Sequence, residues 1–295
     1  MRPSGNGRKR RFLCQEYDGF LAFIISYNND MEPQKITSEH DTLLTAFAES
    51  RIGGRAENQD SYGWQDTPLG YLVSVCDGMG GGPGGKTASA MAVREILASV
   101  GEATGDEAPA DMVARAVRRA NQAIFDAGRQ QPTLHGMGTT ATVLLIGAQS
   151  AVVAHVGDSR VYQLREGKKV FRTFDHSLVF QQVAKGIITE EQARVSGRSN
   201  LITRALGICS SVDVEVHELP YLRGDRFLLC TDGIHGTMPE EHLIDMVADR
   251  QMSPCDVTDG VATLVDALGH SLGGRHDNLT LALVETHKDS APQPK

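Results

Sequence analysis

Apolar residues in the middle of the chain form short continuous runs separated by turn residues. Four of these runs are rich in β-branched residues and predict consecutive antiparallel strands: TTATVLLIG, SAVVAHVGD, RVYQLREG and KKVFRTF. The first two are apolar almost throughout, which is typical of strands buried on both faces. Further strands are predicted at GYLVSVCD, VDVEVHEL, DRFLLCTDG and NLTLALVET.

Helical spacing of apolar residues appears on either side of this block of strands. Residues 86–100 and 109–128 predict two helices, the second with Pro109 near its start and Gly128 near its end. PEEHLIDMVADR and CDVTDGVATLVDALGHSL predict two more. A block of strands with helices toward both ends of the sequence favours the α+β class over a doubly wound parallel sheet.

Residues 41–287 contain no long linker, repeat or low-complexity tract, so we expect a single domain there. Residues 1–40 are expected to be a disordered extension or the product of a mis-called start, with Met31 as the alternative start. An interaction or membrane-surface segment is the functional alternative. Residues 288–295 are polar and predicted to be a disordered tail.

The extension carries RKRRF followed by GFLAFIISY, which superficially resembles a signal peptide. Glu16 and Asp18 lie between the two, the apolar run is short, and no A-x-A-like site follows, so export is not expected. The run is also too short for a transmembrane helix.

Charge and cysteine content narrow the functional classes. The net charge of -8 gives no sign of the basic surface that nucleic-acid-binding proteins carry. The five cysteines are scattered, with no C-x-x-C pair, and predict neither a disulfide framework nor a zinc knuckle. A reducing cytoplasm is the expected compartment.

Four aspartates stand where a predicted strand meets a turn: Asp60, Asp77, Asp232 and Asp277. Any one of them could be structural, because Asp-Gly is a common turn dipeptide. Carboxylates at the ends of neighbouring strands would converge at one edge of a sheet and repel one another unless protons or cations neutralise them. Oxygen ligands of this kind suit Mg²⁺ or Mn²⁺ rather than zinc.

Several short segments lie in order between residues 55 and 284: RAENQD, VCDGMGG, GMGTTATVLL, HVGDSRVYQL, DHSLV, ITRALG, TDGIHGTM and HDNLTLALV. In this set the chain resembles the bacterial PP2C-type (PPM family) metal-dependent protein serine/threonine phosphatases. The resemblance implies a central sandwich of two antiparallel β-sheets flanked by helix pairs, with a two-metal centre at one edge. It also implies that residues 176–207 form the flap that borders the active site of the family.

The resemblance assigns roles to individual residues by motif. Asp77 would bridge both metals, and the Gly78 carbonyl would add a ligand. Asp232 and Asp277 would hold the first metal, and Asp60 would serve the second, directly or through water.

The implied reaction is hydrolysis of phosphoserine and phosphothreonine on proteins by a water that bridges the two cations. Arg55 would clamp the phosphoryl oxygens. A monomer that opposes a bacterial serine/threonine kinase is expected. The group that protonates the leaving alkoxide is not identified, because Met79 stands where eukaryotic relatives have a histidine.

Some residues depart from the family pattern or look structural. Lys86 replaces a residue that is often acidic, and the absence of an acidic residue beside GMGTT leaves a third metal without support. Asp158 and Arg160, in GDSR, are predicted to bond locally in a turn between two strands. His235 receives no assignment.

Two alternative functions stay open from the residues. The first is a catalytically silent phosphatase-like binding module, which the presence of all four aspartates disfavours. The second is nucleotide binding by Gly80–Thr87, because GGGPGGKT matches the phosphate-binding P-loop pattern. Pro83 has no N–H to offer a phosphate, and Asp77 would repel it, so this is the least favoured function.

Overall fold

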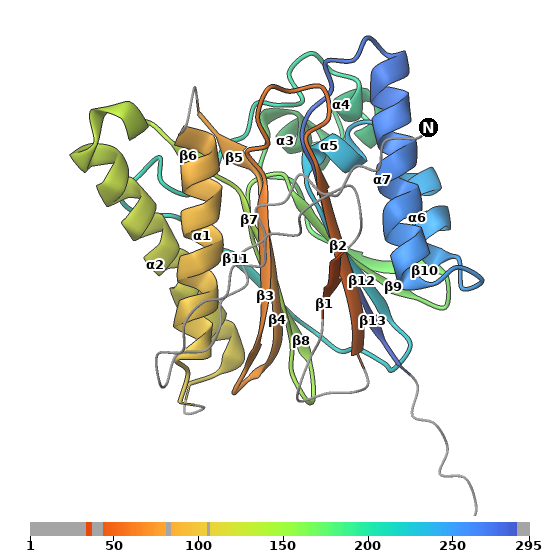
Figure 1. The fold of residues 1–295 in the computed structure, drawn as a ribbon, viewed down its shortest axis with the longest axis horizontal. Helices are drawn as coiled ribbons and strands as arrows, with labels where there is room; N and C mark the ends of the chain where they lie inside the picture. Colours follow the sequence, from red (N-terminus) through yellow and green to blue (C-terminus); the bar gives the residue numbers. More distant parts are fainter. Residues whose placement is uncertain (1–33, 37–43, 81–83, 105–106, 288–295) are drawn as a thin grey trace, which may run out of the picture.

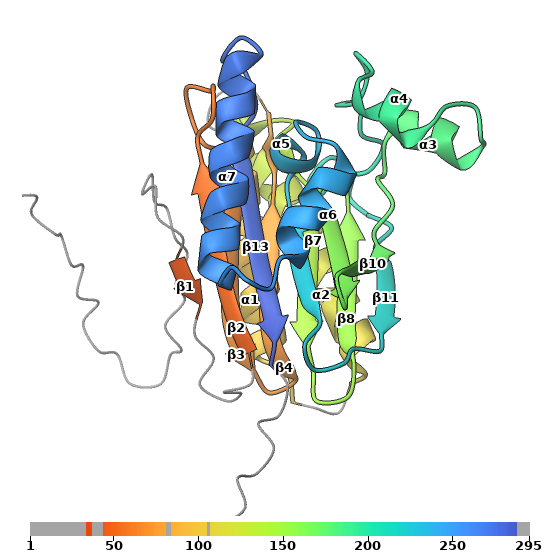
Figure 2. The same cartoon turned by 90° about the vertical axis from the view of Figure 1, so that its right-hand side faces the viewer.

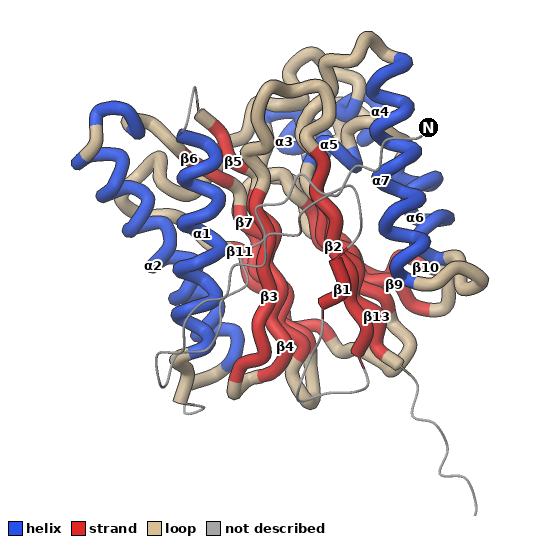
Figure 3. The backbone as a smooth tube through the Cα atoms, viewed as in Figure 1, coloured by secondary structure: helices blue, strands red, loops and turns tan. Residues whose placement is uncertain are grey.

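The computed structural model describes residues 34–36, 44–80, 84–104 and 107–287. Two antiparallel β-sheets pack face to face, and helices cover the outer face of each (Figures 1 and 3). This four-layer α+β sandwich confirms the predicted fold class. The expectations for residues 1–33, 37–40 and 288–295 lie outside the described residues.

The first sheet has six strands. Their spatial order is β1 (Gln34–Ile36), β2 (Leu44–Arg51), β13 (Leu279–Thr286), β12 (Arg226–Cys230), β9 (Arg160–Arg165) and β10 (Lys168–Arg172). β1 falls inside the predicted extension and pairs antiparallel with β2, with Gln34 opposite Ala48. A three-residue strand has too few residues for an alternating pattern, which is why the sequence did not reveal it.

The second sheet has five strands. Their order is β11 (Glu215–Leu219), β8 (Ala151–Val156), β7 (Ala141–Ile146), β4 (Gly70–Cys76) and β3 (Ser61–Thr67). A small separate pair joins β5 (Gly78–Met79) to β6 (Gly138–Thr139). β4 lies between β3 and β7 and is antiparallel to both, so it does not belong to a parallel βαβ unit.

Helices α1 (Gly84–Gly101) and α2 (Pro109–Gln130) cover the second sheet, and α6 (Glu240–Ala248) and α7 (Pro254–Ser271) cover the first (Figures 1 and 2). A short 3₁₀ helix (Pro132–Leu134) follows α2. No helix in the described ranges combines the length and the apolar character that a bilayer crossing requires.

Three apolar clusters fill the spaces between the four layers. One lies between the sheets, and the other two lie between each sheet and its helix pair. Successive residues of a central strand enter different clusters: Leu144 packs between the sheets, and Leu145 packs under α1 and α2. This arrangement confirms that the continuously apolar runs are strands buried on both faces.

The predicted flap contains two short helices, α3 (Leu178–Ala184) and α4 (Glu190–Arg194), which project from the sandwich (Figure 2). The Ser177 hydroxyl caps α3 by accepting a hydrogen bond from the Phe180 N–H. Thr189 and Gln192 form a capping box at α4. Local capping of this kind stabilises helices that bury few side chains.

Candidate active site

Figure 1 shows β5 and the short helix α5 (Asp232–His235) at one edge of the sandwich. Four aspartates next to strand ends gather there, around one cavity. Asp77 directly follows β4, and Asp232 follows β12 after one residue. Asp60 directly precedes β3, and Asp277 lies two residues before β13. The four aspartates that the sequence places at strand ends therefore lie together. Asp232 is the first residue of helix α5 rather than part of a turn.

A cavity of about 540 Å³ opens at this edge. Five of the predicted site residues line it: Arg55, Asp77, Gly78, Asp232 and Asp277. Asp60 lies behind the wall, where its carboxylate accepts a hydrogen bond from the Thr231 hydroxyl at 3.0 Å. The structure thus brings all six predicted residues together.

Asp77 is held through its backbone. Its N–H donates to the Thr140 hydroxyl at 2.9 Å, and its carbonyl accepts from the Thr140 N–H at 2.8 Å and from the Thr139 hydroxyl at 2.7 Å. These bonds fix the main chain and leave the carboxylate to face the cavity. The GMGTT segment therefore positions Asp77.

Gly78 has no room for a side chain. A Cβ atom there would lie 2.2 Å from the carbonyl oxygen of Gly85 and 2.5 Å from that of Gln59. Both contacts are with main chain, which cannot move aside cheaply. Only glycine lets the chain turn from β4 into β5 at this point.

We expect Gly78→Ala to lower the free energy of unfolding by about 3 kcal/mol, because the methyl group forces two backbone segments apart. Gly197→Ala is the matched control, since a Cβ at Gly197 meets no atom within 4 Å. Urea unfolding of both variants with the same divalent cation present measures the difference. Equal stabilities for the two variants would contradict the steric argument.

Burial and mutual repulsion raise the pKa values of several carboxyl groups in the site. Burial, with a further contribution from Asp232, raises the pKa of Asp60 to about 7. Burial and the charge of Asp277 raise the pKa of Asp232 to about 6. Burial and neighbouring carboxylates also raise the pKa of Asp77 well above its usual value.

Divalent cations fit this environment. The Oδ1 atoms of Asp60 and Asp232 are buried and accept no hydrogen bond from any described residue. Buried carboxylate oxygens without donors are costly unless a positive charge approaches them. A set of carboxylate and carbonyl oxygens is the donor chemistry that Mg²⁺ and Mn²⁺ prefer.

Arg55 and Asp277 form an ion pair at the mouth of the cavity, with 2.6 Å between Nη2 and Oδ2. Both side chains are partly exposed, so this pair contributes little to stability. Asn278 ties their two loops together: its Nδ2 group donates to the carbonyls of Ile52 and Glu57, and its Oδ1 accepts from the Gln59 N–H. The guanidinium is thereby placed beside the carboxylates.

Asp158 is the residue that the sequence reading missed. It is buried, lines the same cavity, and has a pKa raised by burial and by Asp232. It was predicted to serve only a local turn. Its position just beyond β8, in VGD, repeats the pattern of Asp77 in VCD, and this repeated strand-end aspartate is the signal that would have found it.

The neighbours of Asp158 also differ from expectation. Arg160 does not bond within the turn; it makes a buried two-point ion pair with Asp175 at 2.7 and 2.8 Å. His235 is buried, and its Nε2 lies 3.0 Å from the Asp158 carbonyl. Burial lowers the pKa of His235, so a neutral ring donates this bond and holds the Asp158 backbone.

The P-loop match receives no support from the fold. Lys86 lies in the first turn of α1, with its ammonium 3.5 Å from the Glu57 carboxylate. The strand before the loop has only antiparallel partners, whereas a P-loop belongs to a parallel βαβ unit. Residues 81–83 of the motif lie outside the described residues.

Comparison with known proteins agrees with this geometry. The family model for protein phosphatase 2C matches residues 49–269. A curated relative, the serine/threonine phosphatase stp of Listeria welshimeri, is 34% identical over 236 residues, which are 79% of this chain and 88% of the relative.

Two solved structures share the fold over most of their length. The serine/threonine phosphatase Stp1 from Staphylococcus aureus is 26% identical with a TM-score of 0.76, covering 86% of this chain and 100% of that one. The catalytic domain of the phosphatase PstP in complex with two manganese ions is 31% identical with a TM-score of 0.67, covering 83% and 99%. By its sequence, its fold and the carboxylates gathered at one sheet edge, this chain belongs to the protein phosphatase 2C family.

Proposed function

We propose that this chain hydrolyses phosphoserine and phosphothreonine on proteins, using two divalent cations held by Asp60, Asp77, Gly78, Asp232 and Asp277. The observation that carries the proposal is the group of four carboxylates around one open cavity, two of which have buried oxygens without a hydrogen-bond partner among the described residues. The manganese ions of PstP and the naming of the relatives as serine/threonine phosphatases support it.

The bound cations supply Lewis-acid stabilisation of phosphoryl charge and a water of lowered pKa. The described residues of the chain provide the frame for that chemistry. Thr139 and Thr140 fix the backbone of Asp77 through hydrogen bonds, so its carboxylate stays oriented toward the cavity. Asp158 adds a further carboxylate on the same wall, where it is available to a third cation.

Arg55 is the proposed phosphate clamp. A guanidinium is always ionised and can donate two parallel hydrogen bonds to phosphoryl oxygens. The Asp277 carboxylate holds it at the mouth of the cavity, where it is about half exposed and accessible to a protein-bound phosphate. None of the described residues that line the cavity is a histidine, so the leaving alkoxide is not protonated by an imidazole of this wall.

The cellular setting is inferred from the same family and from the cysteines. A phosphatase of phosphoserine and phosphothreonine implies a kinase that makes its substrates, and we place a cognate serine/threonine kinase in that role. The described cysteines Cys76, Cys209, Cys230 and Cys255 form no disulfide with one another, and we place the chain in a reducing cytoplasm.

The proposed function is tested by phosphate release from a phosphothreonine peptide. We expect hydrolysis in Mn²⁺, none in EDTA, and recovery when Mn²⁺ is restored, because without cations the carboxylates would repel the phosphate and no group would activate the attacking water. Arg55→Ala should lower kcat/KM by about 10- to 100-fold, the cost of losing a charged hydrogen-bond donor. Arg94→Ala is the matched control, because Arg94 is an exposed arginine on α1 outside the cavity. Turnover that persists in EDTA would overturn the mechanism.

A further inference from the structure

A second cluster of metal-ligating side chains lies behind the active-site wall, at the end of α7. Asp266 and His270 are one helical turn apart, and His276 follows in the loop that leads to β13. The Nε2 of His276 lies 2.7 Å and that of His270 lies 3.7 Å from the same oxygen of Asp266, Oδ1. All three potential ligand atoms lie within 4.8 Å of one another.

These distances suit a tetrahedral zinc ion. Ligands about 2.1 Å from zinc at tetrahedral angles lie about 3.4 Å from one another, which is between the two distances measured here. Two imidazole nitrogens and one carboxylate oxygen are ligands that zinc favours, whereas Mg²⁺ prefers oxygen alone. His270 is 61% exposed and Asp266 is 28% exposed, so an ion can enter from solvent and keep a water as its fourth ligand.

The tautomer of His276 is compatible with metal binding. Its Nδ1 is buried and has no hydrogen-bond partner among the described residues, so a shift of the proton from Nε2 to Nδ1 breaks no bond at Nδ1, at the cost of a buried N–H without an acceptor. Nε2 can therefore present a lone pair to the metal when the proton moves to Nδ1. The hydrogen bond to Asp266 is the only described contact of the ring nitrogens that the metal would replace.

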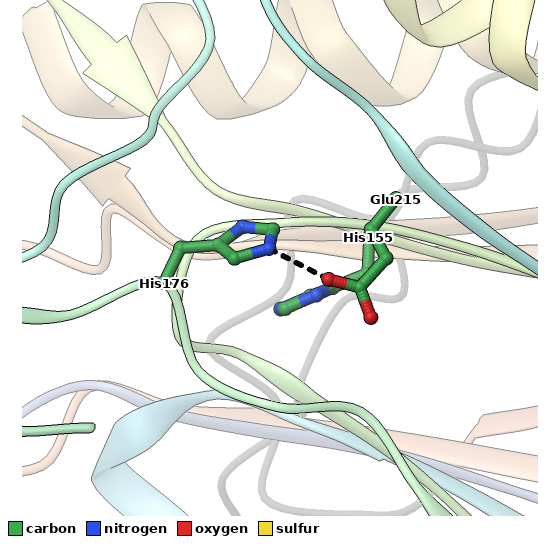
Figure 4. A group of neighbouring side chains, drawn as sticks. All are labelled: His155, His176 and Glu215. Atoms are coloured by element: carbon green, nitrogen blue, oxygen red, sulfur yellow. Dashed lines mark hydrogen bonds and ion pairs between the residues drawn. The ribbon is translucent and has the colours of Figure 1, made fainter. Parts of the chain in front are cut away.

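In a second candidate cluster, the hydrogen bonds of a histidine leave no nitrogen lone pair for a metal. His155, His176 and Glu215 also lie close together, with His155 opposite Glu215 across the β8–β11 pair (Figure 4). The Gly157 N–H donates to Nδ1 of His176, which leaves the proton on Nε2. That nitrogen donates to Glu215 at 3.0 Å and has no lone pair for a metal. The hydrogen bond between His176 and Glu215 ties the start of the flap to β11, whereas neither ring nitrogen of His155 has a hydrogen-bond partner among the described residues.

His276 lies in the loop before β13 that also carries Asp277. The next residue is Asp277, one of the proposed metal ligands. The His276 carbonyl accepts a hydrogen bond from the Gly54 N–H at 3.1 Å, directly beside Arg55. A ligand that fixed the His276 ring would therefore also fix the segment that carries Asp277.

We propose that Asp266, His270 and His276 form a zinc-binding site, distinct from the carboxylate cavity, that anchors the loop carrying Asp277 to the end of α7. The site takes Zn²⁺ through two imidazole nitrogens and one carboxylate oxygen. None of its three side chains lines the active-site cavity, so zinc binding can be measured without an assay of hydrolysis.

The test is a Zn²⁺ titration of the full chain in saturating Mg²⁺, which occupies the carboxylate cavity in preference to imidazole sites. We expect His270→Ala to remove one zinc ion per chain or to weaken its binding by about ten-fold or more. Loss of a residue that only hydrogen-bonds to a metal ligand already weakens metal binding by about ten-fold, and His270 is proposed to bind the metal directly. His242→Ala, an exposed histidine of α6, is the matched control. Asp266→Asn keeps the size of the side chain and should give the same loss.

Hydrogen exchange provides a second readout that does not depend on hydrolysis. Zinc should slow amide exchange in residues 273–278 of the wild-type chain and leave it unchanged in His270→Ala. Identical zinc stoichiometry and affinity in His270→Ala and wild type would overturn the site. Zinc binding without slower exchange would overturn the anchoring of the loop. Neither result depends on whether the phosphatase assay succeeds.

Discussion

Asp77→Asn is expected to reduce the rate of phosphopeptide hydrolysis in Mn²⁺ by about 10²- to 10³-fold or more. Loss of one group that stabilises transition-state charge already costs that much, and Asp77 is proposed to hold both cations. Its carboxylate faces the cavity beside Asp232 and Asp158. Asparagine has nearly the same shape, so the loss reports on charge and metal binding rather than on packing.

The variant is also expected to fold. The backbone bonds of Asp77 to Thr139 and Thr140 do not involve its side chain and remain available. Removing one negative charge from a repelling group should raise the melting temperature of the metal-free protein. Asp126→Asn is the matched control, because Asp126 is exposed on α2. Full activity of Asp77→Asn, or loss of activity in Asp126→Asn, would contradict the assignment.

The second large effect concerns stability without metal. The metal-free protein is expected to be less stable at pH 8 than at pH 5, by about 4 kcal/mol, and saturating Mg²⁺ should remove most of this difference. The folded-state pKa is raised to about 7 for Asp60 and to about 6 for Asp232, mainly by burial. Each unit of pKa shift corresponds to about 1.4 kcal/mol.

The sign follows from proton linkage. A carboxyl group whose folded pKa is raised binds its proton more tightly in the folded state. Its contribution to stability is fully present below the unfolded pKa of 3.8 and is lost as the pH rises through about 6 to 7. A divalent cation that binds only the folded state replaces the lost protons and restores stability at high pH.

Thermal unfolding at pH 5 and pH 8, with EDTA or with Mg²⁺, measures this effect. The double variant Asp60→Asn/Asp232→Asn should show a smaller pH dependence than wild type, because its two amides do not titrate, while Asp77 and Asp158 remain titratable. Equal metal-free stability of the wild-type chain at the two pH values would show that folding does not raise the pKa values of Asp60 and Asp232.

Most strands and helices of the fold could be predicted, because buried positions give each element a recognisable pattern of apolar residues. Strands such as β7 and β8, covered on both faces, read as continuous apolar runs, and α2 reads as a helix through its spacing and Pro109. β1 could not be predicted in this way, because its three residues owe their conformation to pairing with β2.

Some aspartates of the candidate site could also be predicted from the sequence, and one could not. Asp77 and Asp232 each end a predicted strand, so their convergence followed from the sequence pattern and the family resemblance. Asp158 occupies an equivalent strand end, but Gly-Asp-Ser also reads as an ordinary turn. Only the packing of β8 beside β7 places its carboxylate in the cavity.

The strands, the strand-end carboxylates and the family resemblance could be predicted from the sequence, because they depend on local periodicity and on short ordered motifs. The tertiary structure alone decided which distant side chains meet. Arg55 reaches Asp277 across the chain, and His276 reaches Asp266 and His270 because Gly269 leaves space for its ring: a Cβ there would lie 2.1 Å from the His276 Cγ. Such contacts depend on the approach of separate segments, and neither segment records the position of the other.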